Sequence, residues 1–246
     1  WPMPMEMLAG DGTELRARLL ALGVEIHASR SSRDNLANYL QSARTSERVR
    51  CVPRIGWCGD AFVLPGLTIG GGEGERLLFQ TAREFAHHFE LAGTLEDWRE
   101  HVARYCVGNS RLMLVVSCAF AAPLLEPMGA DGAGIHIKGP SSDGKTTSLL
   151  VGGSVCGGGG RNGFIETWRS TSNALEGVAE AHNDSLLCLD ELAQLSPTEA
   201  GEISYLLANG RGKQRMSRTA ALRPGAHWRL LFLSSGETGL ADHVAT

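Results

Sequence analysis

The most informative stretch of the chain reads Gly134-Ile135-His136-Ile137-Lys138-Gly139-Pro140-Ser141-Ser142-Asp143-Gly144-Lys145-Thr146. Its first five residues have the apolar pattern of a short strand, and the rest satisfy Gly-x-x-x-x-Gly-Lys-[Ser/Thr]. A helix is predicted to continue from Thr147 to Val151. Small residues let consecutive backbone N–H groups close on phosphates, and the N-terminus of the helix adds partial positive charge. The pattern therefore predicts a nucleotide-binding loop over residues 139–147.

Two side chains of this loop are expected to act on the nucleotide. Lys145 is predicted to reach the β- and γ-phosphates of ATP, and Thr146 to ligate Mg²⁺. The alternative is a glycine-rich turn that binds no ligand.

A second strand is predicted at Leu186–Leu189, a continuous apolar run typical of central parallel strands, and it ends in Asp190-Glu191. Carboxylates at the end of such a strand are expected to lie beside the phosphate loop. We expect Asp190 to hold Mg²⁺ through a water and Glu191 to orient and deprotonate the attacking water. The alternative is a surface pair of acidic residues that caps the next helix.

A third strand is predicted at Arg229–Leu233, followed by Ser234-Ser235-Gly236-Glu237. Each interval from Lys145 to Asp190 and from Asp190 to Ser235 leaves room for one crossover helix, as parallel strands require. The three strand ends are therefore expected to converge on one nucleotide, where Ser235 would contact the γ-phosphate or the attacking water. The alternative is that the serines cap a helix.

Before the third strand, a helix predicted at Thr198–Ala208 leads into a glycine-flanked basic loop that contains no acidic residue, Asn209–Arg223. Backbone phosphates of single-stranded DNA are the expected ligand. The alternatives are a solvated loop, a salt-bridge surface between subunits, or an arginine that approaches the nucleotide of a neighbouring subunit. The residues predicted to bind DNA are Arg211, Lys213, Arg215 and Arg218.

Composition limits the classes of protein that the chain can belong to. With 246 residues, 43% of them apolar, the chain can bury one substantial core and a small appendage. The chain has 23 basic and 27 acidic residues, which excludes a protein that binds polyanions over its whole surface. Any nucleic-acid site must therefore be local. The apolar run Leu112–Leu125 is too short to span a bilayer and predicts a buried helix, so no membrane is expected as a partner. The six cysteines form no Cys-x-x-Cys pair, which favours a reducing, cytoplasmic location.

Three parts are expected along the chain. Residues 1–74 predict a small α/β appendage, residues 75–128 a helical segment that packs on the core, and residues 129–246 an α/β ATPase core with a parallel sheet. Because the chain begins with Trp1 and shows no leader, we expect it to be a piece of a longer protein. The local patterns of the first two parts predict helices at 14–22, 34–43 and 91–107 and strands at 49–53 and 61–64.

Taken together, these motifs resemble domain of unknown function 927, a family found in proteins of phages, plasmids and integrated elements. That family looks like superfamily 3 helicases and the helicase parts of primase-helicases, which are ring-forming AAA-type ATPases. The resemblance rests on Gly139–Thr146, Trp168–Asn173, Leu187–Leu192, Leu207–Gly210, Leu231–Glu237 and Ala241–His243.

The resemblance implies a hexamer with nucleotide between subunits and a basic hairpin that lines the pore, where Lys213 and Arg215 would touch DNA. Two features depart from the superfamily. Its usual sensor asparagine is replaced by Ser235-Gly236, and no arginine follows Arg229 to serve as a finger. Part of the active site is therefore expected beyond Thr246. A nucleotide-switched DNA-binding module with little hydrolysis and a small-molecule kinase are the alternative functions.

Overall fold

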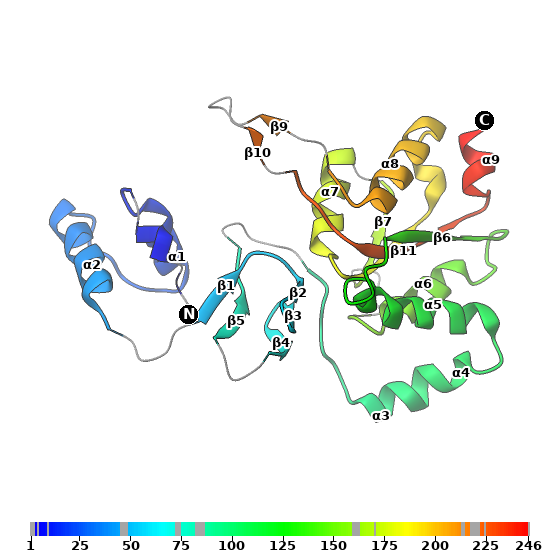
Figure 1. The fold of residues 1–246 in the computed structure, drawn as a ribbon, viewed down its shortest axis with the longest axis horizontal. Coiled ribbons are helices and arrows are strands. Elements are labelled where there is room, and N and C mark those ends of the chain that lie inside the picture. Colours follow the sequence, from blue (N-terminus) through cyan, green and yellow to red (C-terminus); the bar gives the residue numbers. More distant parts are fainter. Residues whose placement is uncertain are drawn as a thin grey trace. The chain divides into compact units, whose positions relative to one another are not determined.

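The largest sheet of the computed structural model has four parallel strands and lies between helices, which makes the protein a mixed α/β protein (Figure 1). The structure describes residues 3, 5–8, 10–44, 49–71, 75–81, 87–158, 163–169, 171–212, 215–216, 222–223 and 225–245. Two units are distinguished, Trp1–Cys51 with Glu73–Leu78 and Val52–Gly72 with Phe79–Thr246. The expected division of the chain at residues 74 and 128 stays a prediction.

The strand order in the main sheet is β6 (Ala133–Lys138), β11 (Leu230–Gly236), β8 (Ser185–Asp190) and β7 (Ile165–Thr167). The three predicted strands are present and parallel, with β11 between the other two. The short edge strand β7 was not predicted, because three residues are too few to show a period.

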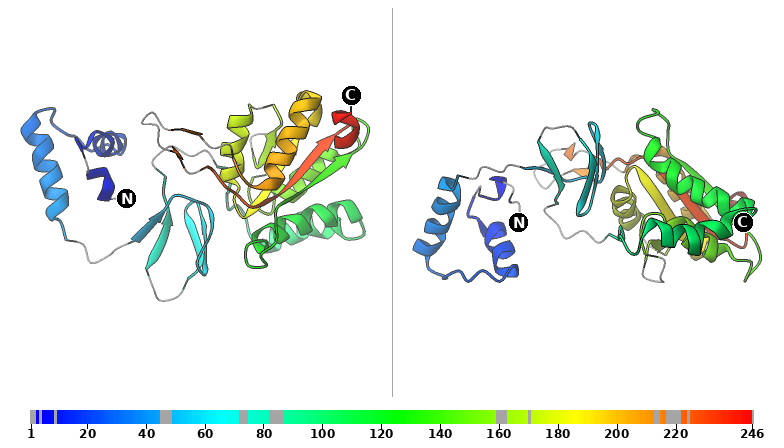
Figure 2. Two further views of the ribbon diagram at one scale, coloured as in Figure 1. Left: turned by 45° about the horizontal axis from the view of Figure 1, so that its top comes forward. Right: turned by 90° about the horizontal axis from the view of Figure 1, so that it is seen from below.

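Alternating side chains of the central strands build a core on each face of the sheet. Leu187 and Leu189 of β8 pack with α7 (Ser172–Ala181) and α8 (Pro197–Asn209). Leu186 and Cys188 face the opposite way and pack with α5 (Ser110–Ala121) and α6 (Lys145–Gly153). Helices therefore cover both faces of the sheet, as Figure 2 shows. Burial on both faces explains why β8 reads as a continuous apolar run.

One glycine of β6 makes room for an aromatic ring of β11. A Cβ on Gly134 would lie 2.0 Å from the ring of Phe232, the residue opposite it in the parallel register. No side chain fits there. The absence of a side chain at residue 134 lets the Phe232 ring pack across β6.

The prediction that the helix over Leu112–Leu125 is buried is wrong for one of its faces. Helix α5 ends at Ala121 and buries Val115, Cys118 and Ala119. The opposite face exposes Met113 by 52% and Phe120 by 56%. A sequence that is apolar all round predicts burial on every side, but α6 and the sheet contact only one side of this helix.

The helix predicted over 91–107 consists of three consecutive segments, α3 (Leu95–Trp98), a π-helical turn η2 (Arg99–Ala103) and α4 (Arg104–Cys106). A capping box between Thr94 and Asp97 starts it. Leu91 is therefore outside the helix and almost fully exposed.

The second unit also contains a small antiparallel sheet of β2 (Gly56–Cys58), β3 (Ala61–Leu64) and β4 (Leu67–Gly70). The remaining elements are short: η3 (Ala122–Leu124), η4 (Leu192–Gln194), β9 (Arg215–Met216), β10 (Leu222–Arg223) and α9 (Leu240–Val244).

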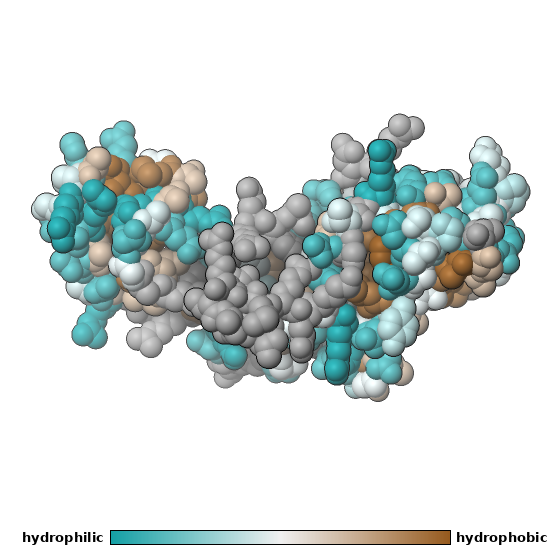
Figure 3. Space-filling view, turned by 90° about the horizontal axis from the view of Figure 1, so that it is seen from above, coloured by the Kyte–Doolittle hydropathy of each residue, from teal (hydrophilic) through white to brown (hydrophobic). Residues whose placement is uncertain are grey.

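The first unit contains η1 (Met5–Leu8), α1 (Thr13–Ala21) and α2 (Arg30–Ser42), close to the predicted helices. The hydroxyl of Ser29 caps α2 by accepting a hydrogen bond from the Ser32 N–H at 3.1 Å. Strands β1 (Val49–Val52) and β5 (Arg76–Phe79) pair in a two-stranded sheet. In the view of Figure 3, the surface of this unit is mostly hydrophilic and also carries apolar areas.

Among the residues that the structure describes, no helix has both the length and the apolar character needed to cross a bilayer. The thiols of Cys106, Cys118 and Cys188 are free and buried. Burial raises the pKa of the Cys188 thiol far above its usual range, so this group packs as a small hydrophobe.

His182 makes the stability of the second unit sensitive to acid. Its ring is buried against Phe89 and Phe164, and its Nδ1 donates to the carbonyl of Val178 at 2.8 Å. Burial lowers the pKa of His182 to about 4, because the protonated ring would lose its hydration. The folded state therefore binds fewer protons than the unfolded state between about pH 4 and 6.5.

We expect the free energy of unfolding to fall as the pH drops from 7 to 5, with His182 contributing about 2 kcal/mol of this loss. Urea denaturation at both pH values measures the loss. In His182→Gln, which keeps a polar side chain but does not titrate, the loss should shrink by the same amount. An unchanged loss in this variant would assign the acid sensitivity to other groups.

Candidate functional site

The predicted phosphate loop lies between the carboxyl end of β6 and the first residue of α6. The ammonium of Lys145 donates to the carbonyls of Gly139 at 2.8 Å and Pro140 at 2.6 Å. Ser142 and Gly144 have positive φ angles of 64° and 75°, a conformation that few residues other than glycine adopt. The loop thus curls around the lysine side chain.

Three predicted site residues from three different segments meet at one carboxylate. Thr146 at the start of α6 donates from its hydroxyl to Oδ2 of Asp190 at 3.0 Å. Ser235, buried at the end of β11, donates to Oδ1 of Asp190 and accepts a hydrogen bond from the Glu191 N–H at 3.2 Å. The parallel register places Ser234 opposite Leu189, so the next residues, Ser235 and Asp190, are neighbours.

Glu191 follows Asp190 in the left-handed region, with φ 64° and ψ 71°. A non-glycine residue held there costs about 1–3 kcal/mol, a cost that functional sites often carry. The Glu191 side chain is exposed, and in the described part of the chain it forms no hydrogen bond or ion pair. Glu191 occupies the N-cap position of the following 3-10 helix η4, but its side chain makes no capping hydrogen bond there, and α8 is capped by Ser196.

The serines after the third strand are part of the sheet, so the alternative that they cap a helix is wrong. Ser234 and Ser235 are the fifth and sixth residues of β11, and the residue at the N-cap of α9 is Gly239. Ser234 contacts Nδ1 of His136 at 2.9 Å and accepts from the indole N–H of Trp168 at 3.0 Å. These contacts hold β11 in place beside the loop.

One charged neighbour of the loop was not predicted from the sequence. Arg111, in the first turn of α5, lies 3.8 Å from a carboxylate oxygen of Asp143. Both side chains are well exposed, so the pair contributes little to stability. No local pattern links two residues on separate elements, which is why this cation beside the loop appears only in the tertiary structure.

The remaining loop residues, Ser141 and Thr147, are exposed.

The donor set of this site suits Mg²⁺, because the Thr146 hydroxyl and the Asp190 carboxylate are hard oxygen ligands. In the described part of the chain, His, Cys, Asp and Glu residues form no cluster of three that could hold a metal ion by themselves.

The predicted basic loop forms a hairpin in which β9 and β10 pair antiparallel, Arg215 opposite Arg223. The side chains of these two strands are not described. At the stem, exposed Arg211 pairs with His227 across an antiparallel bridge. Lys213 and Arg218 lie outside the described residues.

The chain belongs to the family described as domain of unknown function (DUF927), which matches residues 1–227. Its fold is similar to a solved structure described as "SCCmec type IV Cch - active helicase", with a TM-score of 0.73 and 19% identity. The match covers 98% of this chain and 46% of that one, so the chain spans less than half of the similar protein. A search of curated proteins finds no match.

We expect Ser235→Ala to lower the free energy of unfolding by about 1–2 kcal/mol, because the N–H of Glu191 loses its acceptor and Asp190 loses a donor. Urea denaturation measures this change. Ser141→Ala, at an exposed loop position, is the matched control and should stay within about 0.5 kcal/mol of the parent protein. Equal stabilities of the two variants would contradict the contact.

Proposed function

We propose that the chain is a Mg²⁺-dependent ATPase motor of the helicase type that acts on DNA in the replication of a mobile genetic element. The observation that carries this proposal is the meeting of Thr146, Asp190 and Ser235 beside the loop that holds Lys145. The family membership and the fold shared with a protein described as an active helicase support it.

In this proposal residues 139–147 bind the phosphates of ATP. Thr146 and Asp190 would hold Mg²⁺, which neutralises phosphate charge when bound. Lys145 would leave the loop carbonyls to pair with the β- and γ-phosphates. Glu191 would accept a proton from the attacking water, and Ser235 would orient Asp190 and the backbone of Glu191.

The finer assignments rest on the same motifs. We propose an AAA-type core of the superfamily 3 kind over residues 129–246, on which residues 75–128 pack. The packing of α5 on α6 supports the second part. A hexameric ring with nucleotide between subunits, a cytoplasmic location and single-stranded DNA as the partner of the basic hairpin complete the proposal. The hairpin residues proposed to contact DNA are Arg211, Lys213, Arg215 and Arg218.

The test of hydrolysis uses the full-length protein with Mg²⁺ and ATP, with and without single-stranded DNA. Lys145→Ala and Glu191→Gln are expected to lower the hydrolysis rate at least about 100-fold, because each removes charge stabilisation or proton transfer in the transition state. Glu191→Gln should still bind ATP. Glu202→Gln, on the exposed face of α8, is the matched control and should keep the parent rate.

A rate unchanged in Lys145→Ala would refute the ATPase proposal. ATP binding with turnover that neither DNA nor the Glu191→Gln substitution alters would favour the nucleotide-switched module. Phosphate transfer to a small acceptor would favour a kinase.

A separate measurement tests the basic hairpin. The double variant Lys213→Ala, Arg215→Ala is expected to weaken binding of single-stranded DNA to a similar degree for all sequences, because phosphate contacts carry no sequence information. Titrations over a range of salt concentrations should show the slope of log K against log[salt] reduced by about 1.4, the value for two phosphate contacts on a single strand. An unchanged slope would place the DNA contacts elsewhere.

A further inference from the structure

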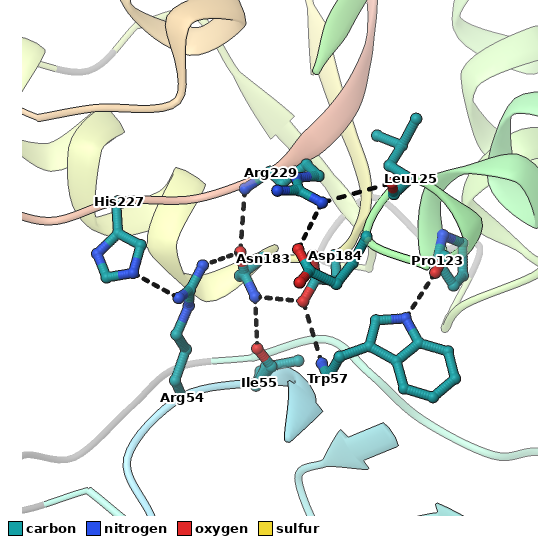
Figure 4. A network of polar contacts seen from close by, with 10 residues as sticks. Arg54, Ile55, Trp57, Pro123, Leu125, Asn183, Asp184, His227 and Arg229 are labelled. Atoms are coloured by element: carbon teal, nitrogen blue, oxygen red, sulfur yellow. Dashed lines mark hydrogen bonds and ion pairs between the residues drawn. The ribbon is translucent and has the colours of Figure 1, made fainter. Parts of the chain in front are cut away.

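Three segments far apart in the sequence meet at the amino ends of β8 and β11 (Figure 4). One segment, residues 54–57, leads into the small sheet of β2, β3 and β4. The other side consists of Asn183-Asp184, immediately before β8, and residues 227–229, immediately before β11. Because the phosphate loop follows the carboxyl end of β6 and the strands are parallel, this contact lies at the opposite end of the sheet.

The small sheet docks at this end through its backbone. The carbonyl of Ile55 accepts from the Asn183 side chain at 2.8 Å, and the N–H of Trp57 donates to Oδ2 of Asp184 at 3.0 Å. Gly56, with φ 102°, lies so close that a Cβ there would be 2.3 Å from the Asp184 carboxylate. Ile55 is only 2% exposed. The contact therefore leaves no room for a side chain at position 56.

Arg54 extends this docking contact to a third segment. One terminal nitrogen of its guanidinium, Nη2, donates to Oδ1 of Asn183, which also accepts from the Arg229 N–H at 3.0 Å. The other, Nη1, lies 2.7 Å from Nε2 of His227. A guanidinium has no acceptor, so Nε2 of His227 accepts. Because the guanidinium is a rigid planar fork, its bond to Asn183 fixes the direction of the hydrogen bond to His227.

His227 belongs to the stem of the basic hairpin. It pairs with Arg211, and the stem is closed by hydrogen bonds from Gly212 N to Ala226 O at 2.8 Å and from Trp228 N to Gly210 O at 2.9 Å. Strand β9, which contains Arg215, begins three residues after Gly212 along the chain. His227 therefore lies at the base of the hairpin, between the sheet and the basic residues.

We propose that Arg54 is a positioning residue for the basic hairpin: it holds His227 and so orients the stem whose basic residues contact DNA. Both terminal nitrogens of Arg54 are engaged within the protein, so it acts through His227 and not by contact with DNA. The docking of the small sheet thereby contributes to DNA binding, because it places Arg54 beside the stem. The expected effect on DNA binding rests on the proposed function, whereas the contact between Arg54 and the stem does not.

The first test measures amide hydrogen exchange in the full-length protein without DNA or nucleotide. In Arg54→Ala, the amides of Gly212 and Trp228 should exchange at least about fivefold faster, because the stem loses the contact that orders it. His227→Gln, whose side-chain carbonyl can accept the same hydrogen bond, should stay close to the parent rate. Unchanged exchange at both amides in Arg54→Ala would overturn the proposal, whatever the protein's function.

The second test measures binding of single-stranded DNA by fluorescence anisotropy and hydrolysis of ATP without DNA. Arg54→Ala should bind DNA about fivefold to tenfold more weakly and hydrolyse ATP at a rate within about twofold of the parent. Arg54→Lys keeps the charge but not the planar fork, and should resemble Arg54→Ala. Arg99→Ala, which removes an exposed arginine paired with Glu96 of its own helix turn, is the matched control and should match the parent.

Full DNA affinity in Arg54→Lys would overturn the positioning role, since charge alone would then suffice. Equal losses of DNA binding and DNA-free hydrolysis in Arg54→Ala would also overturn it, because they would indicate a general defect of folding. If the parent protein binds no DNA, the proposed function fails, and hydrogen exchange at the stem still decides whether Arg54 positions it.

Discussion

The carboxylate of Asp190 joins three segments that are separate in sequence. It accepts hydrogen bonds from Thr146 at the start of α6 and from Ser235 at the end of β11. This arrangement requires β11 to lie between β6 and β8 in parallel, because only that register brings the loop, the acidic pair and the buried serine to one edge. The packing of helices on both faces keeps the strands in that order.

Strand β11 also connects the two ends of the sheet. Its seven residues end at Gly236, next to the buried serine that contacts Asp190. Just before it along the chain, His227 contacts Arg54 of the segment leading into the small sheet, and the Arg229 N–H donates to Asn183, which Arg54 also contacts. The proposed chemical site and the stem of the basic hairpin are therefore connected through one short, buried strand. A buried strand paired on both sides transmits displacement better than a loop does, because close packing resists deformation.

Much of the fold was predictable because local pattern and tertiary burial agree. The strand at Leu186–Leu189 is apolar throughout, and the structure buries it on both faces. The pattern was misleading for α5, where an apolar sequence predicted burial and one face is exposed. A sequence records which residues can be buried, whereas the neighbours available in space determine which of them are. Edge strand β7 was missed because three residues carry too little pattern.

The sequence alone determined the glycine-rich loop over Gly139–Thr146, which is predicted to bind phosphates, and the acidic pair that ends the second strand, because each depends on residues adjacent in the chain. The partner of each side chain was decided by tertiary structure. Thr146 and Asp190 are 44 residues apart, and Arg54 and His227 are 173 apart. The strand register and the docking of the small sheet bring these pairs together, and both arise from packing between segments that no local pattern connects.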